Sequence, residues 1–417
     1  MTQEEIAILS GGEVSEVVEA NLSRDPLGIA MDSRVPHARL VASQVKYLQR
    51  AAKKLPSYYA ARCIIPPLAF EQSSGEAASA HKAGYGGGGL CIDLTCGLGV
   101  DAYGFSRVFD RVAAVERDPV LAQVARENHA RLGAGNIEVV EGDAGEFMER
   151  LVCGGVTGDF AERFARSGAA ADLVYVDPAR RSDAGRKVAG LADCSPDIER
   201  LLPLLRAHSR RVMVKLSPMF DVDEAFRIFG TAVVDVVSVG GECKEVLVIV
   251  GEGIVESVLR VSMLGSGTVE YRCGEPETVT EVEAGYVAEA VSPDDFRYMV
   301  APDAGLVKAR LTERYFRENG GFVGESPYAF YRSEADLPSF VPGTLYRITS
   351  VADYDPVKIK KELKKTGVAR LNILCRNFPD SPARIASRLG VKEGGGRFAA
   401  FVRLGGRLRM VMLDRVR

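Results

Sequence analysis

The sequence predicts an α/β protein built on a Rossmann-like, doubly wound parallel sheet. The first indication is the stretch Leu90–Asp101, in which a short apolar strand runs into Gly97 and Gly99 and then into an amphipathic helix. Strands and helices then alternate as far as Val250, which is typical of a parallel sheet with helical crossovers. A glycine turn of this kind leaves backbone N–H groups open to a ligand, so the sequence also predicts a nucleotide site there.

The alternating region contains a series of expected strands and helices. After the central strand we expect strands at 112–115, 137–140, 173–176 and 212–216, and a closing antiparallel pair at 235–239 and 245–250. The helices expected in this region are 100–109, 119–132, which opens with Pro119, and 196–207. Residues 153–170 follow neither period and are interpreted as an insertion.

The flanking segments predict further domains. Residues 1–80 are expected to be mostly helical, because apolar residues recur at helical spacing over 40–55. The chain therefore divides into an N-terminal helical region (1–80), the nucleotide-binding domain (81–255), a β extension (256–335) and a small α/β domain (336–417). Within these we expect strands in 256–283, a helix at 306–319, a lysine-rich helix at 358–365 and a hairpin turned at Gly405-Gly406.

Composition excludes several classes of protein. Apolar residues make up 47% and charged residues 26% of the 417, which is ordinary for a globular protein. No run of 18 apolar residues and no basic, apolar leader is present, so we expect neither a membrane span nor export, and hence a cytoplasmic protein. Eight cysteines without a CxxC pair, and only four histidines, favour neither disulfides nor a metal site.

Charge is distributed unevenly along the chain. Residues 357–417 contain 16 Lys and Arg against 4 Asp and Glu, a net charge of +12, whereas the remainder contains 37 against 52, a net charge of −15. A basic end on an acidic body predicts a polyanion-binding domain, with a merely solvated basic face as the alternative.

Acidic residues follow the ends of the first three expected strands. Asp93 ends the first strand, where its carboxylate can bind the amino group of a methionine moiety. Glu116 ends the second strand and can accept hydrogen bonds from both ribose hydroxyls, and Asp143 follows the third and can accept one from an adenine amino group. These features favour S-adenosylmethionine over NAD, although Gly97-x-Gly99-x-x-Ala102 also satisfies the relaxed dinucleotide fingerprint.

The fourth strand is followed by Asp177-Pro178, at the edge of the sheet where ligands bind in this architecture. The Asp177 carboxylate and the Pro178 carbonyl can orient an exocyclic amine, and Arg180 and Arg181 can hold a phosphate or guanine O6. Lys215, at the end of the fifth strand, is expected to be a plain strand-end lysine. His81, His129 and His208 have no partner by spacing and are expected at the surface.

These residues resemble the motifs of class I S-adenosylmethionine-dependent methyltransferases, which have a seven-stranded sheet. Residues 93–101 resemble the first motif, Glu116 the second, Asp143 the third and residues 177–180 the fourth. The chain also resembles a bacterial family that joins this domain to a ferredoxin-like segment and a THUMP-like C-terminal domain. The segments that carry this resemblance are FEQSSGEAASAHKA (70–83), VYVDPARR (174–181), KLSPMFD (215–221), YMVAPDAGLVKARL (298–311) and NILCRNFPDSPARIASRLGVKEGGGRFAAF (372–401).

The resemblance implies a cofactor, a partner and a set of site residues. It implies that S-adenosylmethionine is held by Asp93, Cys96, Gly97, Gly99, Asp101, Glu116, Asp143 and Ala144, and that Asp177, Pro178 and Arg180 are catalytic. Because THUMP domains elsewhere bind RNA, it also implies an RNA partner, tRNA or rRNA, bound through the basic residues 357–417.

The reaction type follows from two departures from known patterns. Amino-methyltransferases usually carry Asp/Asn-Pro-Pro-aromatic, whereas this chain has Asp-Pro-Ala-Arg. Uracil-C5 enzymes can carry Asp-Pro-Ala-Arg, but they need a nucleophilic cysteine after the fifth strand, where this chain has Lys215-Leu216-Ser217-Pro218. We therefore predict N-methylation of a base in structured RNA. A methyltransferase acting on a protein or small molecule, and a dinucleotide-binding oxidoreductase, are the alternatives.

Overall fold

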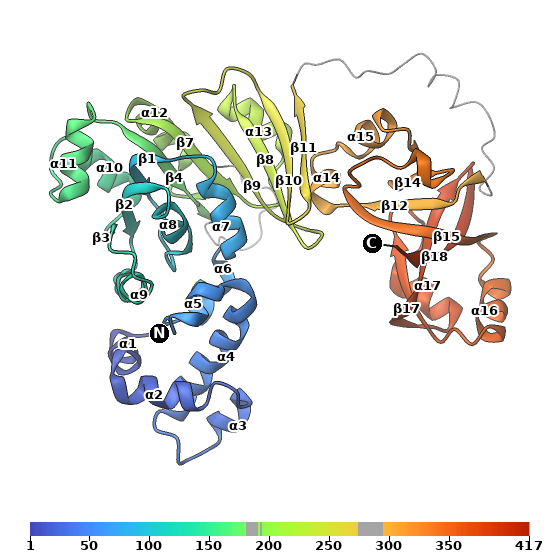
Figure 1. Ribbon diagram of the computed structural model, residues 1–417, viewed down its shortest axis with the longest axis horizontal. Coiled ribbons are helices and arrows are strands. Elements are labelled where there is room, and N and C mark those ends of the chain that lie inside the picture. The colour runs from blue at the N-terminus through green and yellow to red at the C-terminus, as the bar shows by residue number, and fades with distance from the viewer. Residues whose placement is uncertain (181–190, 192–193, 274–294, 417) are drawn as a thin grey trace. The chain divides into compact units, whose positions relative to one another are not determined.

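The computed structural model describes residues 1–180, 191, 194–273 and 295–416 of the 417-residue chain (Figure 1). The chain folds into two compact units. One contains residues 1–234 and 246–257, and the other contains residues 235–245 and 258–417. The chain therefore passes from one unit to the other three times between residues 234 and 258.

The largest sheet of the described chain has nine strands, in the order β11-β10-β8-β9-β7-β4-β1-β2-β3. Strands β7, β4, β1, β2 and β3 run parallel to one another, and β9 pairs with β7 in the antiparallel sense. The predicted Rossmann-like sheet with its closing pair, β8 and β9, is confirmed. The strands are β1 (Gly88–Asp93), β2 (Phe109–Glu116), β3 (Ile137–Glu141), β4 (Ala171–Val176), β7 (Ser209–Leu216), β8 (Val233–Val239), β9 (Glu242–Gly251), β10 (Val258–Leu264) and β11 (Gly267–Arg272).

Helices connect the parallel strands, and Figure 1 shows α8 and α9 on one side of them and α10, α11 and α12 on the other. The expected helix over 100–109 ends at Phe105, because Phe109 already begins β2. The expected insertion at 153–170 contains α11, whose buried face includes Phe160 and Phe164. The helices are α8 (Val100–Phe105), α9 (Pro119–Arg131), α10 (Ala144–Val152), α11 (Asp159–Arg166), α12 (Ile198–Ala207) and α13 (Val222–Phe229).

The N-terminal region is helical, as expected, and packs on the glycine turn. Val41, Val45 and Leu48 on one face of α4 are fully buried, and their cluster continues into Leu98 and Val100 beside the turn. The N-terminal helices therefore share a hydrophobic core with the candidate nucleotide site. They are α1 (Gln3–Ser10), α2 (Gly12–Ala20), α3 (Pro26–Ala30), α4 (Ala38–Lys54), α5 (Pro56–Ala60), α6 (Pro67–Gln72) and α7 (Glu76–Ala83).

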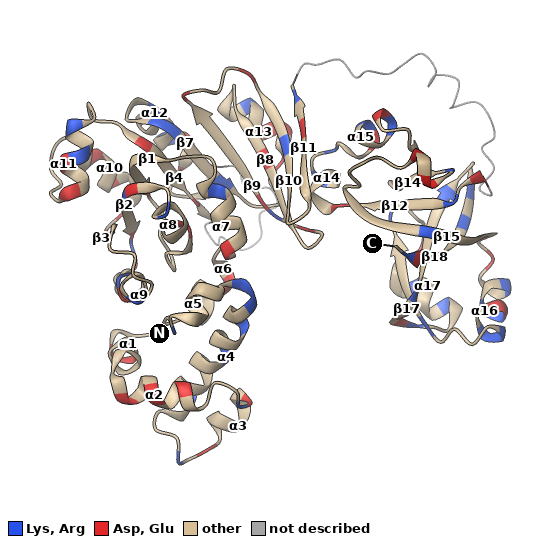
Figure 2. Cartoon of the chain, in the orientation of Figure 1, with Lys and Arg blue, Asp and Glu red and all other residues tan. Residues whose placement is uncertain are grey.

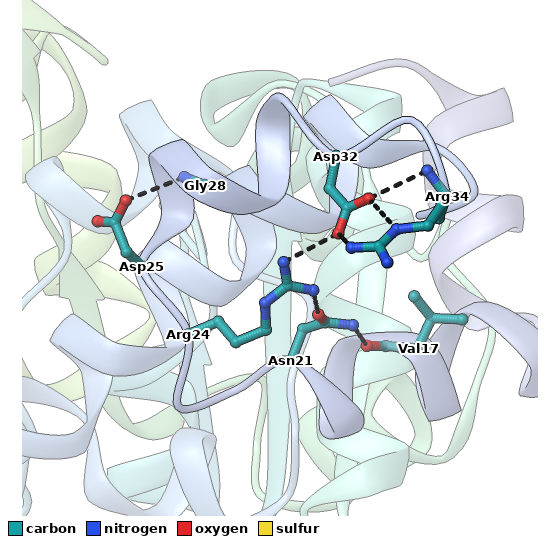
Figure 3. Close-up of polar contacts among 7 residues, drawn as sticks. All are labelled: Val17, Asn21, Arg24, Asp25, Gly28, Asp32 and Arg34. Atoms are coloured by element: carbon teal, nitrogen blue, oxygen red, sulfur yellow. Dashed lines mark hydrogen bonds and ion pairs between the residues drawn. The ribbon is translucent and has the colours of Figure 1, made fainter.

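The connection from α2 to α4 is held by a polar network around Asp32 (Figure 3). The Asp32 carboxylate accepts hydrogen bonds from the backbone N–H and guanidinium of Arg34 and, at 3.0 Å, from the guanidinium of Arg24. These bonds, those from Arg34 first, hold the pKa of Asp32 well below its usual range. Arg24 also donates to Asn21, whose amide donates to the Val17 carbonyl. The network lies at the surface, so it fixes the course of the loop more than it adds stability.

The second unit contains a sheet of seven strands in its described part, in the order β13-β14-β12-β15-β18-β17-β16. The expected hairpin is β17 with β18, and the expected lysine-rich helix is α16. Two helices replace the one expected over 306–319, because Arg310 between them has a positive φ of 58°. The strands are β12 (Tyr298–Pro302), β13 (Phe322–Val323), β14 (Ala329–Tyr331), β15 (Gly343–Asp353), β16 (Arg370–Cys375), β17 (Lys392–Leu404) and β18 (Arg407–Arg415). The helices are α14 (Ala304–Lys308), α15 (Thr312–Glu318), α16 (Pro356–Lys365), α17 (Pro382–Leu389) and the 3-10 turn η3 (Glu334–Asp336).

Two further sequence expectations concern the strands after residue 256 and membrane spans. The strands expected in 256–283 correspond to β10 and β11, but residues 274–283 of that prediction lie outside the described residues. Throughout the part of the chain that is described, every helix is too short or too polar to cross a membrane.

Candidate active site

The turn between β1 and α8 is closed by backbone hydrogen bonds and needs two glycines. The N–H of Cys96 donates to the carbonyl of Val115 on β2, and the N–H of Gly99 donates to the carbonyl of Cys96, both at 2.8 Å. Gly97 and Gly99 have φ angles of 56° and 84°, which residues with a side chain rarely adopt. The predicted glycine turn is therefore present where the first strand ends.

A histidine lies directly against this turn. His129 on α9 is only 3% exposed, and its Nε2 lies 3.0 Å from the Gly99 carbonyl. Burial lowers the pKa of His129, so the ring is neutral and Nε2 donates its hydrogen to that carbonyl. A Cβ at Gly99 would lie 2.4 Å from Nε2. The expectation of a surface histidine is wrong at this position, because the buried ring supports the turn.

Glu116, at the end of β2, faces the glycine turn. One carboxylate oxygen accepts a hydrogen bond from the Gly97 N–H at 2.8 Å, and the other accepts one from the Asp118 N–H at 2.9 Å. Each carboxylate oxygen has two acceptor positions, so both keep one for a ligand. The contact predicted between Glu116 and ribose hydroxyls stays a prediction, and the same side chain also braces the turn.

Asp93 is a buried carboxylate with an unused oxygen. It is 0% exposed, and its Oδ1 accepts a hydrogen bond from the Thr95 N–H at 2.9 Å. Its Oδ2 is buried and has no hydrogen-bond partner among the described residues. Burial, reinforced by the neighbouring acids, raises the pKa of Asp93 well above its usual value. Such an atom is costly unless a donor or a cation reaches it.

Asp101, in the first turn of α8, belongs to a buried polar network. Its carboxylate accepts hydrogen bonds from the hydroxyls of Ser74 at 2.9 Å and Tyr175 at 2.8 Å, and it lies 3.1 Å from the ammonium of Lys82. Lys82 on α7 is 0% exposed. Burial alone would raise the pKa of Asp101, but Lys82 and the other donors hold it below its usual value. The cofactor contact predicted for Asp101 stays a prediction.

Sequence reasoning missed this buried lysine, although Lys82 lies in the segment 70–83 that carries the family resemblance. The available signal is the run of small residues around Ser79 on α7, which lets α7 approach α8 closely. A Cβ at Gly104 on α8 would lie 2.2 Å from the Ser79 hydroxyl oxygen. Helices that pack this tightly can enclose a lysine beside its carboxylate partner.

The loop after β4 carries the candidate catalytic residues. Because Val176 on β4 is paired with Val214 on β7, the next residues, Asp177 just after β4 and Lys215 within β7, lie side by side. The Lys215 ammonium forms an ion pair with Oδ2 of Asp177, and the Asp177 N–H donates to the hydroxyl of Thr95 at 2.7 Å. Lys215 is thus an ion-pair partner of Asp177 and not an isolated strand-end lysine.

The residues after Asp177 are described in part. Pro178 is half-buried, and residues 179–180 form β5 (Ala179–Arg180), with Arg180 paired with Cys194 of β6 (Cys194–Ser195). The structure describes the backbone of Arg180, so the role predicted for its guanidinium stays a prediction. Arg181, the other predicted phosphate ligand, lies outside the described residues.

The remaining candidates have clear local roles. Asp143 caps α10, because its carboxylate accepts hydrogen bonds from the N–H groups of Gly145 at 2.8 Å and Glu146 at 3.3 Å. Ala144 beside it is buried. Cys96 is also buried, and burial raises the pKa of its thiol well above the usual value, which disfavours the thiolate that a nucleophile needs. The adenine contact predicted for Asp143 stays a prediction.

The chain is similar to known proteins in sequence and in structure. Residues 343–415 match the family model described as THUMP domain-like. Over 365 residues the chain is 26% identical to two proteins from Mycobacterium tuberculosis (strains CDC 1551 and H37Rv), each named an uncharacterized S-adenosylmethionine-dependent methyltransferase, with 86% of this chain and 90% of theirs covered. A crystal structure from Porphyromonas gingivalis W83, named provisionally as a methyltransferase, has a TM-score of 0.75 and 23% identity over 100% of this chain and 99% of that one.

The fold and these similarities support the predicted class, a class I methyltransferase with a THUMP-like C-terminal domain. The likeness to the Porphyromonas gingivalis structure runs through the whole chain. It therefore includes the N-terminal helices and the C-terminal domain as well as the central sheet.

Proposed function

We propose that this protein transfers the methyl group of S-adenosylmethionine to an exocyclic nitrogen of a base in structured RNA, tRNA or rRNA. The observation that carries the proposal is the contact between the glycine turn and the Asp177 loop, where the Thr95 hydroxyl accepts the hydrogen bond from the Asp177 N–H at 2.7 Å. These loops follow the carboxyl ends of adjacent parallel strands, which is where ligands bind in open α/β sheets.

The residues on the cofactor side fit S-adenosylmethionine. The buried Oδ2 of Asp93, which has no partner among the described residues, suits the amino group of the methionine moiety. Glu116 and Asp143 keep acceptor positions for the ribose hydroxyls and the adenine amino group. When bound, S-adenosylmethionine supplies an electrophilic methyl group on a sulfonium sulfur.

The residues on the acceptor side suit an amine. Lys215 engages Oδ2 of Asp177, and Oδ1 has no partner among the described residues. This oxygen and the Pro178 carbonyl can accept hydrogen bonds from the two N–H groups of an exocyclic amine. The nitrogen lone pair is then oriented for transfer, and the rate gain comes from alignment more than from acid–base catalysis.

The cysteines near the turn argue against attack through a covalent adduct. A uracil-C5 mechanism needs a thiolate, but burial raises the pKa of the Cys96 thiol well above its usual value. At the end of β7, where that chemistry would need a cysteine, Lys215 is paired with Asp177. An amine acceptor therefore fits the site better than a ring carbon.

Two features of the C-terminal domain support RNA as the substrate class. Residues 343–415 match a THUMP-like model, and residues 357–417 carry a net charge of +12 against −15 for the rest of the chain. A concentrated positive charge favours a polyanionic partner and a salt-dependent association.

Mass spectrometry of nucleosides from tRNA and rRNA of a strain that lacks the gene tests the proposal. We expect one methylated nucleoside to be missing, to return with the wild-type gene, and to stay missing with Asp177→Asn. A matched control is Asp110→Asn, because Asp110 is an exposed residue near the opposite end of β2. An unchanged nucleoside profile, or transfer of labelled methyl to the protein fraction only, would contradict the proposal.

A further inference from the structure

We propose that the C-terminal domain has a dedicated site for the phosphate backbone of RNA, formed by Lys360 on α16, Arg370 at the start of β16 and Lys392 at the start of β17. The inference rests on the proposed RNA substrate and goes further. It assigns the surface that holds the RNA and the part of the RNA that this surface contacts.

The basic residues of this domain fall into two groups. Many are neutralised by neighbouring acids: Arg384 and Arg388 by Asp380, Arg397 by Asp414, Arg403 by Glu325, Arg409 by Asp353 and Lys358 by Asp355. By contrast, several others, among them Lys360, Arg370 and Lys392, are exposed and have no ion-pair partner in the described part of the chain. Their charges are available to a ligand.

These three cations come from three elements that meet along β17. Arg370 and Lys392 are paired across the parallel strands β16 and β17. Lys360 lies against the residues that lead into β17, since its Cε and Nζ lie 3.2 and 3.5 Å from the position of a Cβ at Gly390, two residues before Lys392. Figure 2 shows α16 with several positively charged segments in blue. The chain thus gathers positive charge at the edge of the sheet, where β16 is the last strand.

A glycine bulge lies directly against the Arg370 side chain. The register between β16 and β17 jumps from the pair Leu371–Glu393 to the pair Asn372–Phe398, so residues 394–397 bulge from the strand. The Arg370 guanidinium lies 3.2 Å from the position of a Cβ at Gly394. Glycines therefore keep side chains away from this guanidinium.

The bulge is also fixed in shape. The Asn372 amide donates to the carbonyls of Gly395 at 2.7 Å and Arg397 at 3.0 Å, and the Arg370 guanidinium donates to the Glu393 carbonyl at 3.1 Å. Arg370 spends one of its five N–H donors on this bond. The others can bind phosphate oxygens without rearrangement of the loop.

The chemistry of the site selects backbone over bases. Among the described residues that form the site, three cations and a run of glycines offer charge and N–H donors but no aromatic ring for stacking and no amide N–H free to read a base edge. Two acids, Glu362 and Glu393, are close in sequence to the three cations of the site, which outnumber them. A site of this kind holds successive phosphates and positions the RNA without reading its sequence.

Binding of total tRNA to the full-length protein, measured over a series of salt concentrations, tests the site. The variant combines Lys360→Gln, Arg370→Gln and Lys392→Gln. The matched control combines Arg166→Gln, Arg227→Gln and Lys244→Gln, which removes the same charge from exposed residues that have acidic partners. We expect the site variant to lose at least about tenfold in affinity at 0.1 M salt and about 3 units of the logarithmic salt slope, with the control close to wild type.

Three readings separate the outcomes. Calorimetric titration with S-adenosylmethionine, expected to be unchanged in both variants, verifies that they are folded. Wild-type tRNA binding that the site variant retains in full would overturn the site while leaving the proposed substrate in place, whereas no tRNA binding by the wild type would overturn both. If the site variant lost binding to phosphatidylglycerol vesicles but not to tRNA, this surface would be a lipid site, and its assignment to RNA would be wrong.

Discussion

The hydroxyl of Thr95 accepts a hydrogen bond of 2.7 Å from the backbone N–H of Asp177, which joins the loop after β1 to the loop after β4. The Thr95 N–H in turn donates to Asp93 at 2.9 Å. One short residue therefore links Asp93, the proposed cofactor contact, to Asp177, the proposed acceptor contact. Because methyl transfer depends on alignment of the two substrates, a small shift in this link is expected to lower the rate.

Thr95→Val tests this link, because valine keeps the shape of threonine and removes the acceptor. We expect kcat to fall about 10–100-fold, and unfolding to become easier by about 1–2 kcal/mol, since the Asp177 N–H loses its partner. Affinity for S-adenosylmethionine, measured by calorimetry, should change less than about threefold. Thr95→Ser, which restores the hydroxyl, should recover most of the rate. A wild-type rate in Thr95→Val would show that the link has no part in alignment.

Lys215→Met tests whether the ion pair orients the Asp177 carboxylate. Methionine fills a similar space without the charge, so Asp177 is expected to lose its fixed direction and kcat to fall about tenfold or more. Lys215→Arg should retain a substantial part of the rate, because a guanidinium can also hold the carboxylate. Lys244→Met removes an exposed lysine that is paired with Glu242, and it should be neutral. Equal rates in Lys215→Met and wild type would reduce the pair to a structural contact.

The strand-end acids could be predicted from the sequence, but most of their partners could not. Asp93, Glu116 and Asp177 follow apolar strands directly, and parallel strands bring such residues to one edge of a sheet. The contacts of Asp101 with Lys82 and Tyr175 depend instead on how α7 and α8 pack against the sheet. Residues 19 and 74 positions away from Asp101 supply these groups, and nothing in the local pattern marks them.

His129 illustrates the same limit. A histidine on an amphipathic helix gives no local sign of burial, and its role depends on the absence of a side chain at Gly99, 30 residues earlier. Local turn chemistry required glycine at 97 and 99, and this part was predictable. Only the folded structure shows why a side chain at position 99 is also excluded by tertiary packing: the His129 ring occupies the place of its Cβ.

Gly99→Ala and Gly97→Ala form a matched pair. Both positions have positive φ, at 84° and 56°, so each alanine costs about 1–2 kcal/mol in the backbone. At Gly99 the new Cβ would also lie 2.4 Å from His129 Nε2, whereas at Gly97 the nearest atom is 3.9 Å away. We expect Gly99→Ala to lose about 1–3 kcal/mol more than Gly97→Ala in urea denaturation, because the buried ring must move. Equal losses would mean that His129 yields without cost.

Lys82→Met tests the buried pair with Asp101. Lys82 is 0% exposed and lies 3.1 Å from the carboxylate, so removing its charge leaves the buried Asp101 without its ion-pair partner. We expect a loss of about 3–5 kcal/mol in the free energy of unfolding. Lys82→Met combined with Asp101→Asn should recover much of that loss, since the amide carries no charge and still accepts from Ser74 and Tyr175. A double variant as unstable as the single one would show that packing around Lys82, and not its charge, is what matters.

Asp93→Asn should make the protein more stable and a weaker cofactor binder. Burial, with the neighbouring acids, raises the pKa of Asp93 well above its usual value. The folded state therefore holds this proton more tightly than the unfolded state, whose value is about 3.9. The stability contributed by Asp93 is present below that value and is lost as pH rises through the folded pKa.

Asparagine does not titrate, so the variant should be more stable than the wild type by about 1–3 kcal/mol at pH 8, and the difference should shrink as pH falls toward 5. Urea denaturation at a series of pH values measures it. Loss of the carboxylate should also weaken S-adenosylmethionine binding about tenfold or more, because a charged hydrogen bond to its amino group is removed. Added S-adenosylmethionine should then stabilise the wild type more than the variant. A stability difference that is independent of pH would mean that Asp93 finds a partner in the free protein, and its unused oxygen could no longer be attributed to the cofactor.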